Sequence, residues 1–335
     1  MARVTEWLVA NLEHVEAPFS AELIAGGRSN LTFLITDATG HKLVLRRPPL
    51  GHVLATAHDM AREYRIIASV GKTRVPVPPA LGLCADVAVN DAPFYVMGYV
   101  EGVVLDSAER SAALPRELRV HASEHLVDVL ADLHAVDIDA VGLGDLARRE
   151  GYVERQLKRW STQWANSKTR ELAAIDEVGR LLRERIPAQQ GVSIVHGDYR
   201  FGNCLVDTTS GRIAAVLDWE LCTLGDPLAD LGYLGVYWSD GDDVASLRAN
   251  DPTPAGGFLT YAALLERYGE RTGRDLSEIG YYVAFSCWRL AVISEGVYAR
   301  YLHGAMGDQG LDLAPMKAAT EGLAERALDA VRSLS

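Results

Sequence analysis

A polar turn between two apolar runs constrains this sequence more than any other feature. Residues 194–206 read IVHGDYRFGNCLV, so an acid, a cation and a carboxamide (Asp198, Arg200 and Asn203) stand between two strand-like segments. An ordinary hairpin with a solvated turn has the same outline. The residues that follow decide between a plain hairpin and a reactive site.

A second acidic residue follows at a distance that a hairpin would close. Asp218 lies fifteen residues after Asn203, at the end of the apolar run IAAVL. Two strands over 203–206 and 213–217, joined by the turn DTTSGR, would bring Asp218 back beside Asn203. A carboxylate and a carboxamide oxygen at one strand end are hard ligands of the kind that Mg²⁺ prefers. Asn203 and Asp218 are therefore the candidate metal ligands.

Besides a metal site, phosphoryl transfer requires a proton acceptor and a positive charge, and other polar residues of the turn can supply both. Asp198 is placed to accept a proton from a hydroxyl held in line with a bound phosphate, and Arg200 to meet the phosphate's negative charge. His196, which precedes a glycine, is expected to orient the loop by hydrogen bonding. A metal site, a base and a positive charge together predict a catalytic loop, with Asp198 and Arg200 as its catalytic residues.

Seven motifs in a fixed order extend this interpretation to most of the chain. Together they resemble the aminoglycoside phosphotransferase family, which includes choline kinase-like members and is related to the protein kinases. The similarity is strongest to the branch whose members occur alone or fused to acyl-CoA dehydrogenases, and it covers about residues 20–300. The motifs are GGRSNLTF (26–33), VLRRPP (44–49), REYRI (62–66), VPVP (75–78), FYVMGYVEG (94–102), HGDYRFGN (196–203) and LDWELCTLGDPLADLGY (217–233).

The resemblance implies a fold and a set of roles. The implied fold is α+β and protein-kinase-like, with a small N-terminal lobe on an antiparallel sheet and a larger, mostly helical C-terminal lobe. ATP and Mg²⁺ are the implied cofactors, with Asp198 as catalytic base and with Asn203 and Asp218 as metal ligands. The implied nucleotide contacts come from a glycine-bearing turn over the phosphates and from a hinge at the adenine edge. These residues are Gly26, Gly27, Arg28, Ser29 and Asn30 in the turn, and Met97, Gly98, Tyr99 and Val100 in the hinge.

The third strand departs from the usual kinase pattern. Kinase folds carry a lysine there that holds the α- and β-phosphates and pairs with a helix glutamate. In HKLVLRR this position falls on Arg46, with Glu63 as its expected partner, while Arg47 and Lys42 are the alternatives in other registers. Arginine binds phosphate well, but its planar fork differs from the point charge of lysine. Arg46 and Glu63 are therefore included among the nucleotide-binding residues.

The hydrophobic pattern predicts the order of the elements. An amphipathic helix opens the chain, three short strands follow within residues 19–49, and a helix that starts near Met60 ends at Gly71. Two further strands are expected over 81–89 and 93–100. Helical segments are then expected around 147–186, 254–271, 277–301 and 315–333, after one that ends near His134, with a single β-like island at 192–218. The predicted division is a nucleotide-binding lobe over 1–100 and a helical lobe over 101–335.

The composition limits the classes of partner that we expect for this chain. The chain has 33 basic and 45 acidic residues, so no global positive charge predicts nucleic-acid binding. Four widely spaced cysteines without a C-x-x-C pair favour buried thiols over a metal or disulfide framework. We find no secretory signal and no apolar run of membrane-spanning length, which predicts a cytoplasmic protein without a membrane partner. The oligomeric state is left open, a homodimer included.

The distribution of charged residues and the family resemblance indicate which molecule accepts the phosphate. The family phosphorylates hydroxyl groups of small molecules, and the resembling branch implies a hydroxy acid or hydroxyacyl-CoA. The chain ends AERALDAVRSLS, without the acidic cluster that a polycationic antibiotic needs. Arg155, Lys158 and Arg159 lie on one predicted helix, either as a solvated face or as a site for an acidic acceptor. Of the aromatic residues on the predicted helices, most are expected in the core and a few at the acceptor.

Other interpretations compete with a small-molecule kinase. The arginine at position 46 is also compatible with a pseudokinase that binds nucleotide without turnover, although Asp198, Asn203 and Asp218 are intact. A protein kinase is disfavoured because the D-F-G and A-P-E signatures are absent. His134, Asp226 and Asp230 are expected to serve structure, His134 in the core and Asp226 as a helix cap.

Overall fold

The strand-like runs of the first hundred residues form one antiparallel sheet. The structure, a computed structural model, describes residues 2–26, 30–49, 59–240, 251–304 and 312–334. The strand order is β1-β2-β3-β5-β4, so β1, β2 and β3 are neighbours in sequence order, while β5 lies between β3 and β4. The strands are β1 (Ser20–Gly26), β2 (Leu31–Thr36), β3 (Lys42–Arg47), β4 (Ala80–Cys84) and β5 (Phe94–Gly98).

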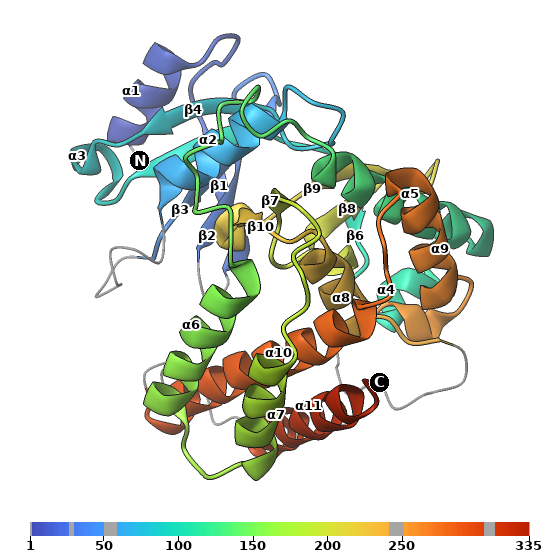
Figure 1. Cartoon of the computed structure of the whole chain (residues 1–335). Helices are drawn as coiled ribbons and strands as arrows, with labels where there is room; N and C mark the ends of the chain where they lie inside the picture. Colours follow the sequence, from blue (N-terminus) through green and yellow to red (C-terminus); the bar gives the residue numbers. More distant parts are fainter. Residues whose placement is uncertain (1, 27–29, 50–58, 241–250, 305–311, 335) are drawn as a thin grey trace.

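Alternation along β3 divides the core of this lobe between two helices. Leu43 and Leu45 pack in a cluster with Leu8 of α1 (Ala2–Asn11), on one side of the sheet. Val44, between them, belongs to the larger core that includes α2 (Met60–Val70), on the other side (Figure 1). Successive side chains of a strand point to opposite faces, so both faces of the sheet are covered.

The predicted second helix is confirmed, and one predicted strand is shortened. Asp59 accepts a hydrogen bond from the Arg62 N–H at the start of α2, and the helix ends before Gly71. The strand expected over 81–89 ends at Cys84, and the short helix α3 (Val87–Asn90) follows it. The Asp86 carboxylate accepts from the Ala88 N–H there, which gives the chain a helix cap in place of a strand ladder.

The second half of the chain is mainly helical, as predicted. Its long central helix, α10, packs against α6, α7, α8 and α11 (Figure 1). The helical segment expected over 147–186 is two helices, because residues 168–172 form a turn between them. The helices are α4 (Ala108–Ala112), α5 (Arg116–His134), α6 (Tyr152–Ser167), α7 (Ala173–Glu184), α8 (Leu228–Val236), α9 (Tyr261–Thr272), α10 (Ile279–Leu302) and α11 (Ala314–Arg332).

Short strands bring the predicted β island to the boundary with the sheet lobe. β8 (Cys204–Val206) pairs with β9 (Ile213–Val216) and with β6 (Val103–Val104), while β7 (Ser193–Val195) pairs with β10 (Thr223–Gly225). Strands β6 and β10 are not predicted by the sequence. A strand of two or three residues has too short a pattern to be recognised without its partner. The division at residue 100 stays a prediction.

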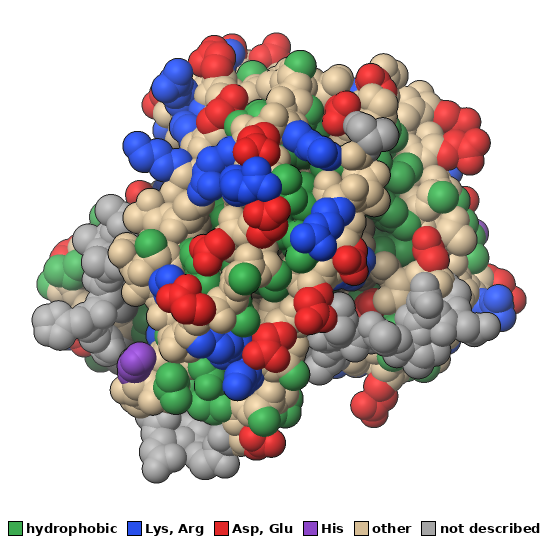
Figure 2. All heavy atoms as spheres, turned by 60° about the horizontal axis from the view of Figure 1, so that its bottom comes forward, with side chains coloured by type: hydrophobic (Ala, Val, Ile, Leu, Met, Phe, Trp, Pro, Cys, Tyr) green, Lys and Arg blue, Asp and Glu red, His purple; other side chains and the backbone are tan. Residues whose placement is uncertain are grey.

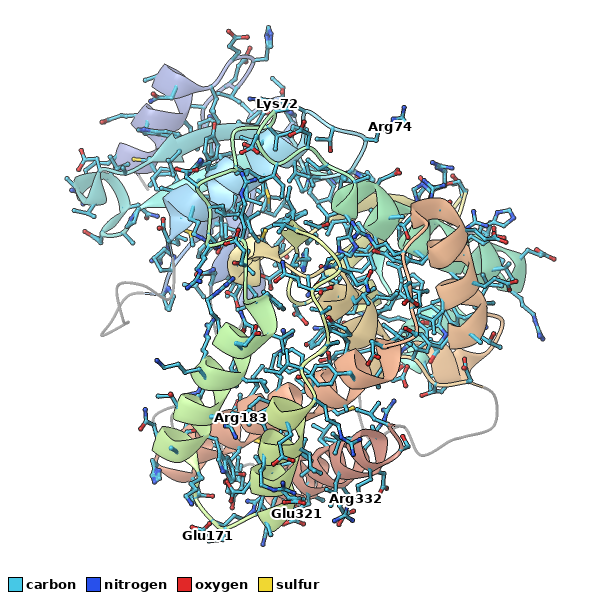
Figure 3. The ribbon with its side chains drawn as sticks, in the orientation of Figure 1. Lys72, Arg74, Glu171, Arg183, Glu321 and Arg332 are labelled. Atoms are coloured by element: carbon cyan, nitrogen blue, oxygen red, sulfur yellow. The ribbon has the colours of Figure 1, made fainter. Side chains whose placement is uncertain are left out.

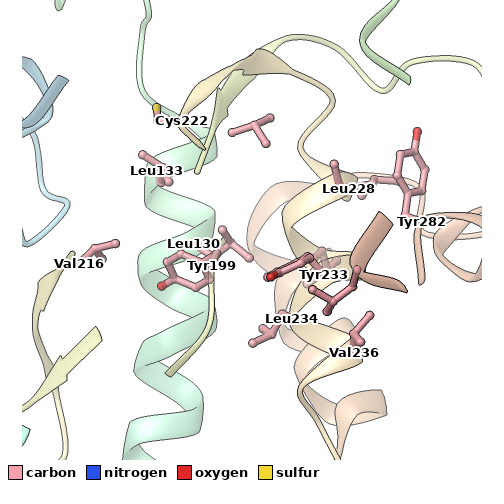
Figure 4. Packing of buried hydrophobic residues seen from close by; sticks show 14 of the residues in the cluster. Leu130, Leu133, Tyr199, Val216, Cys222, Leu228, Tyr233, Leu234, Val236 and Tyr282 are labelled. Carbon is pink, nitrogen blue, oxygen red and sulfur yellow. The ribbon is translucent and has the colours of Figure 1, made fainter. Parts of the chain in front are cut away.

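Aromatic and aliphatic side chains hold the segment around Tyr199 in the core. Figure 4 shows Tyr199 beside Leu130 of α5, with Leu133 farther along this helix and Tyr233 of α8 nearby. The Tyr199 hydroxyl donates to the Leu126 carbonyl of α5 at 2.7 Å. This anchor fixes the backbone immediately after Asp198.

Charged side chains cover the outside of the helical lobe. Acidic and basic groups are interspersed on the face shown in Figure 2. Glu171, Arg183, Glu321 and Arg332 lie at the end of the helical lobe farthest from the sheet (Figure 3). Within the described residues, we find no helix that is both long and apolar enough to span a membrane.

Candidate active site

The hairpin predicted around Asn203 and Asp218 is confirmed. Cys204 pairs with Val216, and the Leu217 N–H donates to the Asn203 carbonyl at 2.8 Å. This bond sets Asp218 next to Asn203 across the end of the two strands. Asp218 has a φ of 63°, in the left-handed region that few non-glycine residues adopt. Such strain is typical of positions that aim a side chain for function.

Asp198 lies within hydrogen-bond reach of Asn203. The Asn203 Nδ2 donates to the Asp198 Oδ2 at 2.7 Å and to the Asp198 carbonyl at 2.8 Å. Arg200 forms an ion pair with the other carboxylate oxygen, with its Nε 3.4 Å from Oδ1. The Arg200 guanidinium also lies over the Tyr237 ring, 4.8 Å from its centre. The four predicted polar residues of the loop and hairpin are thus gathered at one place.

Buried groups hold the loop from behind. The Asp230 carboxylate of α8 accepts hydrogen bonds from the His196 N–H at 2.6 Å and from the Gly197 N–H at 2.8 Å. The His196 Nε2 lies 2.9 Å from the Leu217 carbonyl, which ties the loop to the residue before Asp218. Gly197 has a φ of +85°, and a Cβ there would lie 2.8 Å from the Leu221 carbonyl oxygen. His196 therefore orients the loop, as predicted, and position 197 requires glycine.

His134 continues this buried network. Its Nε2 lies 3.3 Å from the Asp230 Oδ2, and its Nδ1 lies 2.8 Å from the Tyr268 hydroxyl. A neutral imidazole satisfies both contacts by donating to Asp230 and accepting from Tyr268. Burial lowers the pKa of His134 below its usual 6.5, although Asp230 acts to raise it. His134 is a core histidine, as the sequence predicts.

We expect the stability of the protein to fall with acidification through this histidine. In the unfolded chain the imidazole takes up a proton near pH 6.5, whereas the folded protein resists it, so the free energy of unfolding decreases as pH falls below that value. One proton corresponds to at most about 1.4 kcal/mol per pH unit. Urea unfolding from pH 7.5 to 5 should show a shallower pH dependence in His134→Gln. Equal slopes in the two proteins would contradict this assignment.

Among the basic residues of β3, Arg46 is the one that contacts Glu63 and Asp218. Its Nε lies 3.2 Å from the Glu63 Oε2, and its Nη2 lies 2.6 Å from the Asp218 Oδ1. Glu63 is buried on α2 and also accepts from the Asn30 Nδ2 at 3.0 Å and the Tyr95 hydroxyl at 3.1 Å. The predicted Arg46–Glu63 ion pair is therefore present. Arg46 additionally links the sheet lobe to Asp218.

The two alternative cations of β3 have other partners. Arg47 donates to the Pro48 carbonyl at 3.4 Å and lies over the Phe33 ring. Lys42 lies 3.8 Å from the Glu101 carboxylate, at the beginning of the strand. In the described part of the chain, neither residue forms an ion pair with Glu63.

Replacing Arg46 with alanine should destabilise the protein strongly. Burial already raises the pKa of Glu63, although Arg46 acts to lower it, and the variant would leave this buried carboxyl without its cation. Breaking a buried pair in this way costs about 3–5 kcal/mol. Urea unfolding followed by circular dichroism measures the loss. Arg47→Ala is the matched control and should cost about 1 kcal/mol, the value of its ring contact; equal losses in the two variants would exclude a special role for Arg46.

An apolar cavity of about 600 Å³ opens beside Arg46 and Asp218. Val44, Met97, Leu205 and Val216 contribute to its walls, from both lobes. The predicted hinge residues Met97, Gly98, Tyr99 and Val100 line one edge. The volume is typical of small-molecule sites.

The predicted phosphate turn is only partly described. Gly27, Arg28 and Ser29 lie outside the described residues, while Gly26 ends β1 and Asn30 contacts Glu63. In the hinge, the Gly98 N–H donates to the Pro79 carbonyl at 2.8 Å. The Gly98 N–H is thus already engaged, and the adenine contacts expected of the hinge stay a prediction.

Comparison with known proteins decides the family. The APH family of phosphotransferase enzymes matches residues 20–278, which is most of the chain. The chain belongs to the APH phosphotransferase family. The resemblance inferred from the seven motifs and the kinase-like fold are thereby confirmed.

Relatives of this APH chain include parts of larger proteins. It is 33% identical over 296 residues to acyl-CoA dehydrogenase family member 10 of Mus musculus, covering 87% of the chain and 27% of the relative. It is 32% identical over 323 residues to acyl-CoA dehydrogenase family member 11 of Gallus gallus, covering 94% of the chain and 41% of the relative. The chain thus spans less than half the length of these relatives.

Solved structures share the fold over the whole chain. A candidate aminoglycoside phosphotransferase from Ralstonia eutropha superposes with a TM-score of 0.81 at 32% identity, covering 99% of this chain and 98% of that one. Aminoglycoside phosphotransferase APH(4)-Ia, solved with AMP-PNP and hygromycin B, superposes with a TM-score of 0.63 at 17% identity, covering 98% of each chain. The second likeness shows the fold alone.

The polar groups of the APH site fit a magnesium ion. Asn203 and Asp218 both line the large cavity, and their side-chain oxygens are the hard donors that Mg²⁺ prefers. The Asn203 Nδ2 faces Asp198 and the Asp218 Oδ1 faces Arg46. No group of three or more His, Cys, Asp or Glu side chains with metal-binding placement occurs in the described segments. Asn203 and Asp218 stay the predicted ligands, and an ion held by these two residues would need further ligands from phosphate or water.

Several residues of the APH site are not predicted by the sequence. Tyr95 donates to Glu63, Tyr237 stacks on Arg200, and Arg289 of α10 donates to the Gly197 carbonyl. Arg289 is 92 positions from Gly197, and it is buried among aromatic rings. No local pattern marks such a residue, because only the folded chain brings α10 to the loop.

Proposed function

We propose that the chain is an ATP- and Mg²⁺-dependent phosphotransferase that moves the γ-phosphate to a hydroxyl group of a small molecule. One observation carries the proposal. Asp198, Asn203 and Asp218 converge at the end of one hairpin. An apolar cavity lined by residues of both lobes lies beside them. Membership of the APH family supports the same reaction class.

Each residue of the site has a separate role in the proposed reaction. The cavity lined by Val44, Met97 and Val216 takes the adenine ring, and Asn203 and Asp218 hold the metal. A bound Mg²⁺ supplies positive charge to the phosphates during transfer. Asp198 accepts the proton of the acceptor hydroxyl, and the Asn203 Nδ2 fixes one of its two carboxylate oxygens.

Arg200 places a positive charge next to Asp198. Its Nε lies 3.4 Å from the Asp198 Oδ1, so its positive charge lies beside the proposed base. The stacking of its guanidinium on Tyr237 holds the cation at the loop. A contact between Arg200 and the transferred phosphate is part of the proposal.

The acceptor is proposed to be a hydroxy acid or a hydroxyacyl-CoA. A hollow with three arginines lies beside the catalytic loop, and it suits an anion better than a polycationic antibiotic. The names of the relatives, acyl-CoA dehydrogenase family members, point to acyl thioesters in those proteins. The alternatives are a true aminoglycoside phosphotransferase, which the fold neighbours represent, and a pseudokinase.

A transfer assay with labelled ATP tests the proposal. Wild-type protein and Asp198→Asn are incubated with γ-labelled ATP, Mg²⁺ and one acceptor at a time: a set of hydroxy acids, their CoA thioesters, choline and kanamycin. We expect label on a hydroxy acid or thioester with the wild type and not with the variant. Label on kanamycin alone would make it an antibiotic kinase. ATP binding without transfer to any acceptor would favour the pseudokinase.

A further inference from the structure

A small polar hollow adjoins the catalytic loop on the side of α6 and α10. Its volume is about 220 Å³, and its walls come from α2, α6, α10, the loop at Gly197 and the segment after Asp218. Figure 1 shows the upper end of α6 close to the sheet lobe, next to β10. Three arginines from three different helices line this hollow: Arg62 of α2, Arg159 of α6 and Arg289 of α10.

Arg289 is the buried member of the three. Its side chain belongs to a residue that is 4% exposed, and its Nη2 donates to the Gly197 carbonyl. The guanidinium lies over the Tyr233 ring, 4.4 Å from its centre. Its Nε is buried and has no hydrogen-bond partner in the described structure. A buried cation with an unused donor is costly unless an anion compensates it.

Arg62 lies in the wall of the hollow, and Arg159 lies at its rim. Arg62 is half-buried and donates to the Cys222 carbonyl, while Arg159 is more exposed and lies over the Trp160 ring, 5.0 Å from its centre. Partial desolvation and the positive charges of Arg289 and Arg62 lower the pKa of Arg159. Arg159 therefore lies near enough to the other two arginines for their charges to act on it.

Three acidic residues, Asp59, Glu63 and Glu220, also line the hollow. Asp59 accepts from the Arg62 backbone N–H as the cap of α2. Glu63 contacts Arg46 and Tyr95, and Glu220 lies 4.0 Å from the Arg46 Nη2. Among the ion pairs of the described residues, none involves a guanidinium of the hollow. The guanidinium groups contact the Gly197 and Cys222 carbonyl groups and aromatic rings, and the negative charges of Asp198 and Asp230 also act on Arg289.

We propose that Arg62, Arg159 and Arg289 bind the anionic group of the phosphate acceptor, a carboxylate or a phosphate. The inference rests on the proposed function and specifies its acceptor site. Gly197 lines the hollow and immediately precedes Asp198, so an anion bound there lies beside the base that receives the acceptor's proton. The volume holds a carboxylate or phosphoryl group and is too small for an entire aminoglycoside.

Anion binding can be measured without turnover. The nucleotide site is filled with AMP-PNP and Mg²⁺, and thermal unfolding is followed while inorganic phosphate or acetate is added at constant ionic strength. Whichever anion binds should raise the unfolding midpoint of the wild type, and the two series tell phosphate from carboxylate. In Arg159→Gln and Arg62→Gln the apparent affinity should fall about tenfold, the value of one charge-assisted hydrogen bond.

Lys158→Gln provides the matched control. Lys158 is exposed on the same helix, one position before Arg159, and does not line the hollow, so its variant should bind the anion like the wild type. No midpoint shift in the wild type, or equal affinities in all four proteins, would overturn the proposal. With an acceptor from the transfer assay, Arg159→Gln should raise KM about tenfold and leave kcat within about twofold. Transfer without anion binding would refute this inference alone, and anion binding without transfer would refute the proposed function alone.

Discussion

Asp198→Ala should abolish phosphoryl transfer and leave the protein folded. The carboxylate is the only group at the loop placed as a base in our proposal, and general-base catalysis contributes about 10²–10⁴-fold to a rate. The loop keeps its other supports, because Asp230 holds the backbone of His196 and Gly197 and Tyr199 is anchored to α5. The measurement is kcat with the acceptor identified in the transfer assay, together with the unfolding midpoint.

Two further observations make this result interpretable. Asp198→Asn preserves shape and removes only the charge, so a similar loss in both variants identifies proton acceptance as the role of the residue. ATP affinity should stay within about twofold of the wild type, because Asp198 lies outside the lining of the large cavity. Normal turnover in either variant would refute the assignment of Asp198 as the base.

Asp218→Ala should remove the dependence of ATP binding on Mg²⁺. The variant deletes the carboxylate that, with Asn203, is proposed to hold the ion between the phosphates and the protein. Isothermal titration of ATP into wild type and variant, with and without Mg²⁺, measures the effect. We expect a metal-dependent gain in affinity of at least about tenfold in the wild type, and none in the variant.

The contact between Asp218 and Arg46 calls for a control. Asp218→Ala also takes a carboxylate away from Arg46, at 2.6 Å, so a loss of binding could come from a displaced arginine. Glu220→Ala removes another carboxylate near Arg46, at 4.0 Å, without touching the proposed ligands. Mg²⁺-dependent binding in Glu220→Ala and not in Asp218→Ala would assign the effect to the metal. Metal-dependent binding retained in Asp218→Ala would exclude the proposed ligand set.

Much of the fold and the centre of the site could be predicted from local patterns. The hairpin that joins Asn203 to Asp218 needs only two short apolar runs and a turn between them, and all three are visible in the sequence. The succession of three strands, a helix and two strands is visible in the sequence, whereas the insertion of β5 between β3 and β4 is seen only in the structure. The choice between Arg46 and Arg47 required the structure, because strand register decides which side chain faces Glu63.

The unpredicted parts depend on contacts between distant segments. The strand predicted through residue 89 gave way to α3 because Asp86 caps a helix there, a local competition that alternation alone does not reveal. Asp230 was expected to be structural, but its support of His196 and Gly197 becomes visible only when α8 packs behind the loop. The hollow beside Gly197 combines arginines from α2, α6 and α10, and no sequence window contains all three.

The position of Arg46 has a consequence for motion. Its guanidinium touches Glu63 of the sheet lobe and Asp218 of the helical lobe at once, and it occupies a carboxylate oxygen that a metal would use. Separation of the lobes must pull Arg46 away from Asp218, whereas the pair to Glu63 can travel with the sheet. Opening of the cleft would then also release that oxygen, so under the proposed function the same motion would admit the nucleotide and free the proposed metal ligand.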